Sequence, residues 1–164
     1  MKTHRIALLL LLATGLALSP LTATEKSDPS WEKLKSLVGA WEGAMEGQPS
    51  HVTYALVSSG TALMETIESS DATQMVTLYH PDGTSLLMTH YCSMGNQPRM
   101  RSKGLKDGRL EFNFVDVSNL KSPDAPRMTH LVLTFTDASH LVHEWTDKAG
   151  AKEVISRFEF TRAH

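Results

Sequence analysis

Residues 127–136 read Arg-Met-Thr-His-Leu-Val-Leu-Thr-Phe-Thr, and this run predicts the type of fold. Leu131, Leu133 and Phe135 fall on one face of an extended segment, and His130 falls on the other, because side chains alternate along a strand. The run is rich in β-branched and aromatic residues, which favour strands. It therefore predicts a strand with one apolar face and one mixed face.

Runs of the same kind recur on both sides of this segment, separated by turn signals such as Pro81-Asp82-Gly83 and Asp107-Gly108. The other expected strands lie at residues 40–46, 51–58, 62–69, 73–80, 85–92, 99–105, 109–117, 140–146 and 152–161. A parallel sheet would need helical crossovers between the strands, and no helical periodicity follows residue 39. The sequence thus predicts an all-β fold, an antiparallel up-and-down barrel of about ten strands.

The N-terminal region predicts an export signal at residues 1–23. Lys2 and Arg5 precede an apolar run that starts at Ile6. A membrane-spanning helix needs about 20 apolar residues, and Ser19-Pro20 interrupts this run earlier. We expect a mature protein that is periplasmic or secreted, without stable membrane insertion after signal cleavage. A retained single-span anchor is the alternative.

The rest of the chain divides into a polar linker at residues 24–30 and one barrel domain at residues 31–164. Trp31, Leu34 and Leu37 are spaced as on one face of a helix. They predict a short N-terminal helix before the barrel, with Ser30 as its N-cap.

Composition excludes several classes of protein. The chain has 164 residues with 16 Lys and Arg and 18 Asp and Glu, a net charge of −2. Such a balance lacks the basic surface that nucleic-acid binding requires. Cys92 is the only cysteine, which rules out an intramolecular disulfide. We expect Cys92 to be buried and unreactive, because an exposed lone thiol is a liability in an oxidising compartment.

The segment Leu37-Val-Gly39-Ala-Trp41-Glu-Gly43 resembles the opening of calycin barrels, which include lipocalins, fatty-acid-binding proteins and nitrobindin-like proteins. The resemblance implies that Trp41 plugs one end of the barrel and that Gly39 and Gly43 let the first strand bend. The paired cysteines of classical lipocalins and the helical lid of fatty-acid-binding proteins have no counterpart here. The segment at 89–100 resembles a family of exported bacterial proteins of unknown function, which implies no activity.

A candidate ligand site follows from a predicted hairpin. Met88, His90 and Cys92 share one face of its first strand, and Arg99 and Arg101 share one face of its second. If both faces point inward, the pocket pairs an apolar wall with two cations, which suits an amphipathic carboxylate. The alternative is that the arginines face solvent.

Three further residues complete this candidate site. Asn96 and Gln97, in the turn of the hairpin, would either bind the polar head of a ligand or only hold the loop. His130 would converge on the site from another strand. The candidate ligand-binding residues are Met88, His90, Cys92, Asn96, Gln97, Arg99, Arg101 and His130.

These features predict an exported binding protein that holds a small apolar or amphipathic ligand in the barrel, with neither cofactor nor catalysis. A barrel of about ten strands is too wide for its own side chains to fill. One alternative is a nitrobindin-like haem- or metal-binding barrel acting on reactive nitrogen or oxygen species, with His90, His130 or His143 as ligand. Another is an interaction module of the cell envelope. No nucleophile-elbow or dinucleotide-binding motif supports an enzyme, and nothing in the sequence indicates an oligomeric state.

Overall fold

The computed structural model describes residues 28–45, 47–69 and 73–164, and most of these residues lie in strands. The expected signal peptide at 1–23 lies outside the described residues, as does most of the expected linker. The elements are α1 (Pro29–Lys35), β1 (Gly39–Met45), β2 (Gln48–Val57), η1 (Ser58–Gly60), β3 (Ala62–Ser69), β4 (Gln74–Asp82), β5 (Ser85–Tyr91), β6 (Gln97–Ser102), β7 (Leu105–Lys106), β8 (Arg109–Ser118), β9 (Arg127–Phe135), β10 (His140–Ala149) and β11 (Lys152–Arg162).

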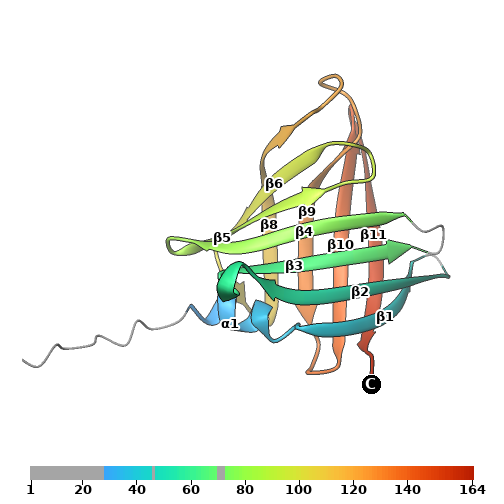
Figure 1. Cartoon of the computed structure of the whole chain (residues 1–164). Coiled ribbons are helices and arrows are strands. Elements are labelled where there is room, and N and C mark those ends of the chain that lie inside the picture. Colours follow the sequence, from blue (N-terminus) through green and yellow to red (C-terminus); the bar gives the residue numbers. More distant parts are fainter. Residues whose placement is uncertain (1–27, 46, 70–72) are drawn as a thin grey trace, which may run out of the picture.

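Ten of the eleven strands in the described part of the chain close into an antiparallel barrel. From β1 to β6 each strand pairs with the next, β6 pairs with β8, and β11 returns to pair with β1. Figure 1 shows the blue and green strands β1–β4 crossing in front of the orange and red strands β9–β11. The predicted all-β, up-and-down barrel of about ten strands is confirmed.

One strand boundary differs from the sequence-based expectation. The strand predicted at residues 99–105 is divided into β6 and the two-residue strand β7, which pairs with the start of β8. Gly104, between them, has a φ of +121°, a conformation that an extended strand does not contain. The chain therefore turns at Gly104 and leaves the barrel wall before β8 begins.

The short N-terminal helix is also confirmed, but its start is not where the sequence predicted. Asp28 is the N-cap of α1, since its side chain accepts a hydrogen bond from the Ser30 amide at 2.9 Å, and Pro29 occupies the first turn. The Ser30 hydroxyl instead accepts a hydrogen bond from the Leu105 amide at 2.9 Å. Ser30 thus ties the helix to β7 and does not cap it. No helix among the described residues is long and apolar enough to cross a membrane.

The end of the barrel next to α1 is filled by side chains. Trp41, on β1, is 2% exposed, and its indole N–H donates to the Leu37 carbonyl at 2.8 Å. The guanidinium of Arg162 lies 4.3 Å from the centre of the Trp41 ring, a cation–π geometry. Leu34 of α1 is fully buried in the same core. This end of the barrel is therefore closed.

Two glycines shape β1 beside Trp41. At Gly43 a Cβ atom would lie 2.3 Å from the Glu159 carbonyl oxygen and 2.6 Å from the Phe160 ring. Gly39 has a φ of +124°, which a residue with a side chain rarely adopts. Gly43 thus lets β1 and β11 approach closely, and Gly39 lets the chain turn from α1 into β1.

Candidate functional site

A cavity of about 330 Å³ lies inside the barrel at the end opposite α1. It is formed where β3, β5 and β10 end and where β4, β9 and β11 begin. Most of the side chains that line it are apolar or carry sulfur, and a few are polar. They are Ile67, Ser69, Met75, His90, Cys92, Ser93, Met94, Met128, Trp145, Asp147, Val154, Ser156 and Phe158.

His90 lies on the inner face of β5 and is 1% exposed. Its Nδ1 atom is 2.9 Å from the Thr77 hydroxyl, and its ring centre is 4.6 Å from that of Trp145. Its Nε2 atom is buried and has no hydrogen-bond partner among the described residues. An unpaired buried polar atom costs about 1–3 kcal/mol. Burial lowers the pKa of His90 to about 4, so the imidazole is neutral at physiological pH.

Glu65 places a buried carboxyl group in the barrel interior. Glu65, on β3, is fully buried and accepts hydrogen bonds from the hydroxyls of Tyr54 and Tyr79, each at 2.8 Å. The hydroxyl of Thr77 also favours the ionised form of Glu65. Burial raises the pKa of Glu65, and the three hydroxyl groups partly oppose that rise by stabilising the carboxylate. The same burial raises the pKa values of both tyrosines well above 10.

His143, on β10, ends this network on the other side of the barrel. Its Nε2 atom is 2.9 Å from the Tyr54 hydroxyl, and its Nδ1 atom is 3.6 Å from Oε1 of Glu65. Burial lowers the pKa of His143 to about 3. A chain of polar side chains therefore crosses the interior from His143 through Tyr54, Glu65 and Thr77 to His90, and it ends at the cavity.

Cys92 and Asp147 also line the cavity. Cys92 is buried, and burial is the main cause that raises the pKa of its thiol, with a smaller contribution from the charge of Asp147. The Oδ1 atom of Asp147 is buried without a hydrogen-bond partner among the described residues. The lining thus contains two polar atoms without partners, one on His90 and one on Asp147.

The structure brings together only part of the predicted ligand site. Met88, His90 and Cys92 all point into the barrel, with Met88 packed in the core behind the cavity. Arg99 and Arg101 lie on the outer face, where Arg99 pairs with Asp116 and Arg101 lies 2.6 Å from Asp82. Arg99 and Arg101 are paired with Thr89 and Leu87 of β5. These two residues alternate with the inward-facing Met88 and His90, so the side chains paired with them face outward.

The other predicted residues hold loops or lie on the surface. The Asn96 side-chain amide donates to the Pro126 carbonyl at 2.8 Å, and the Gln97 amide donates to the Gly95 carbonyl at 3.4 Å. His130 lies on the outer face, 3.0 Å from Glu111. Neither loop residue lines the cavity.

Sequence reasoning missed Glu65, Tyr54 and Tyr79, although one signal was present. Glu65 lies in the run Leu63-Met-Glu-Thr-Ile67, in which it shares a face with two aliphatic residues. A lone acid on the apolar face of a predicted strand is a signal of a buried polar group. Its partners could not be identified from the sequence, because Tyr54 and Tyr79 come from two other strands.

The histidines do not form a shared metal site. His90 and His143 lie inside the barrel and His130 lies outside it. Among the described residues, no group of three or more His, Cys, Asp or Glu side chains is arranged to hold a metal ion.

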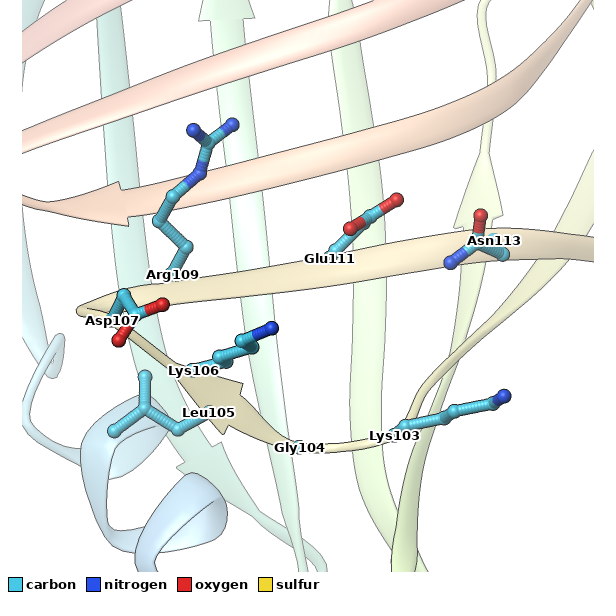
Figure 2. Close-up of a pocket in the computed structure, with 8 residues that line it drawn as sticks. All are labelled: Lys103, Gly104, Leu105, Lys106, Asp107, Arg109, Glu111 and Asn113. Carbon is cyan, nitrogen blue, oxygen red and sulfur yellow. The ribbon is translucent and has the colours of Figure 1, made fainter.

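A larger groove of about 670 Å³ lies on the outside of the barrel, along β7 and β8. Figure 2 shows its side chains, among them Lys103, Lys106, Arg109 and Glu111, spread along the ribbon. The groove carries three bases and two acids, and all four of these side chains are exposed. Arg109 and Glu111 are already paired with Glu144 and His130 outside the groove, and the described residues that line the groove form no apolar wall, so the interior cavity is the stronger candidate site.

Comparison with known proteins gives a fold and no function. No family model matches the chain, and a search of curated proteins finds no match. Among solved structures, a protein of unknown function from the DUF3598 family of Nostoc punctiforme is similar, with a TM-score of 0.56 and 12% identity. The match covers 79% of this chain and 49% of that one, so it spans about half the length of the similar protein. It shows that the two share a barrel fold.

Proposed function

We propose that this protein is an exported binding protein that holds a small apolar or amphipathic ligand in the interior of a calycin-like barrel. The single observation that carries the proposal is the cavity of about 330 Å³ at the open end. Pockets for small molecules start at about 300 Å³ and combine a mostly apolar wall with a few polar groups. The cavity has this size and this composition.

Two further features support the proposal. The end next to α1 is filled by Trp41 and its neighbours, so a ligand would enter from the opposite end. The residues at 1–23 have the composition of an export signal. The segment at 37–43 resembles the opening of calycin barrels, in which the barrel interior is the binding site.

Native mass spectrometry of the purified protein tests the proposal. We expect a second species, heavier than the polypeptide by the mass of a co-purified small molecule, which organic extraction removes. Ligand-free protein should then bind the neutral dye Nile red, and Trp145 should report the binding through a change in fluorescence. Protein that is always empty and binds no apolar probe would overturn the proposal.

Haem binding is a second candidate function, and the unpaired Nε2 of His90 is the observation that favours it. His90 would hold the iron, and haem would supply the redox chemistry for reactive nitrogen or oxygen species. Addition of haem to the protein should then produce a shifted Soret band that His90→Phe abolishes. A spectrum identical to that of free haem would rule this function out.

A further inference from the structure

We infer that the cavity selects ligands that carry hydrogen-bond donors, such as alcohols, phenols or amines, and discriminates against carboxylates. This inference rests on the proposed function and specifies the ligand class of the same site. Two independent observations support it: the hydrogen-bonding state of His90, and the charge of the cavity lining.

With Glu65 ionised, the buried network favours a proton on Nδ1 of His90. A carboxylate can only accept hydrogen bonds, so the Thr77 hydroxyl, which helps to stabilise the ionised Glu65, donates its single proton there. The oxygen of Thr77 then accepts from Nδ1 of His90, 2.9 Å away, and Nδ1 carries the proton in this arrangement. In a neutral imidazole the other nitrogen has a lone pair. His90 Nε2 is therefore an acceptor, and it lacks a donor among the described residues.

The second unpaired polar atom is an acceptor as well. Asp147 lines the cavity, and its Oδ1 atom is buried without a partner among the described residues. None of the described residues that line the cavity is Lys or Arg, and the two arginines expected there lie on the outer face. A carboxylate ligand would thus meet an acid without a compensating cation, whereas a donor would satisfy His90, Asp147 or both.

Three probes with ten carbons each test this selectivity: decanol, its isomer methyl nonyl ether, and decanoate. Decanol can donate a hydrogen bond, the ether can only accept, and decanoate is anionic near neutral pH. Titration calorimetry should show decanol binding about tenfold more tightly than the ether, the ratio that one net hydrogen bond gives. Decanoate should bind most weakly.

Two variants assign the selectivity to its residues. His90→Phe should lower the affinity for decanol to that for the ether and leave the ether unaffected. Asp147→Asn should strengthen binding of decanoate several-fold. His130→Phe, the same substitution on the outer face, is the matched control and should change no affinity. If His90→Phe fails to fold, the ratio of decanol to ether in the wild type still decides the inference.

The outcomes separate this inference from the proposed function. If the ether binds as tightly as decanol, or decanoate binds best, the cavity binds ligands but the inference is wrong. If none of the three probes nor Nile red binds, the proposed function is overturned, and the inference with it.

Discussion

The two ends of the barrel differ in packing and in hydrogen bonding. At the end next to α1, Trp41 is packed under Arg162, and its polar atom is bonded to Leu37. At the opposite end, Trp145 borders a cavity, and both His90 and Asp147 have a buried polar atom without a partner among the described residues. At the first end the indole N–H of Trp41 is bonded and the hollow beside its ring is small, about 170 Å³. The second end has the larger cavity of about 330 Å³ and unpaired polar atoms. We therefore expect substitutions at the closed end to change stability most.

The two tryptophans give the most direct test of this comparison. Trp41→Ala should lower the free energy of unfolding by about 3–5 kcal/mol, the range for removing a buried aromatic side chain. Trp145→Ala should cost less, because its ring borders the larger of the two hollows, about 330 Å³ against about 170 Å³ beside Trp41. Urea denaturation followed by circular dichroism measures both values. Equal losses, or a loss below about 1 kcal/mol for Trp41→Ala, would contradict the contrast between the ends.

Gly43→Ala should cost about 1–3 kcal/mol, the usual effect of forcing extra atoms into a packed region. The added methyl group would overlap the Glu159 carbonyl and the Phe160 ring, so β1 and β11 would have to separate. Ala44→Ser is the matched control, because Ala44 is the next residue of β1 and is exposed. Chemical denaturation of both variants measures the difference, and equal stability would show that the two strands separate without cost.

Tyr79→Phe tests the polar network between the two ends. The substitution removes one hydroxyl donor to the buried Glu65 carboxyl group and should cost about 1–3 kcal/mol. Tyr91→Phe, at an exposed tyrosine, should have almost no effect on thermal or chemical unfolding. If both variants are as stable as the wild type, the Glu65 network does not contribute to stability.

Stability should also depend on pH. The unfolded chain protonates histidine near pH 6.5, whereas folded His90 does so only near pH 4. Between these values the unfolded state binds more protons than the folded state. Because of His90, the free energy of unfolding therefore decreases by about 1.4 kcal/mol for each pH unit that the pH falls. His143 acts in the same direction, and the raised pKa of Glu65 acts in the opposite one. Urea midpoints measured from neutral to mildly acidic pH should shift less in His90→Phe. If the midpoint of His90→Phe shifts with pH as much as that of the wild type, His90 does not cause the pH dependence.

The smallest expected effect is on the chemistry of Cys92. Its thiol is buried and its pKa is raised, so a thiol reagent should modify the native protein slowly at neutral pH. Bound ligand should slow the reaction further, because Cys92 lines the cavity. The same reagent should react at once in urea. Rapid modification of the native protein would show that the open end exposes this thiol.

Local patterns predicted most of the barrel wall. The alternation around Leu131 and Leu133 reports which face of a strand is apolar, and turn residues such as Asp107-Gly108 mark where strands end. The same reasoning placed Met88, His90 and Cys92 on one face, and they all point inward. It could not decide the position of the arginines, since an inward and an outward pair have the same spacing.

The sequence by itself determined the class of fold, the approximate strand boundaries and the sets of residues that share a face, because these depend on neighbours a few positions apart. Only the tertiary structure decided which of those faces meet. Closure of the barrel by β6 and β8 leaves Arg99 and Arg101 outside, and it joins Tyr54, Glu65 and His143 from three strands into one network. Contacts between residues as far apart as Tyr54 and His143 depend on register and closure, which no short stretch of sequence encodes.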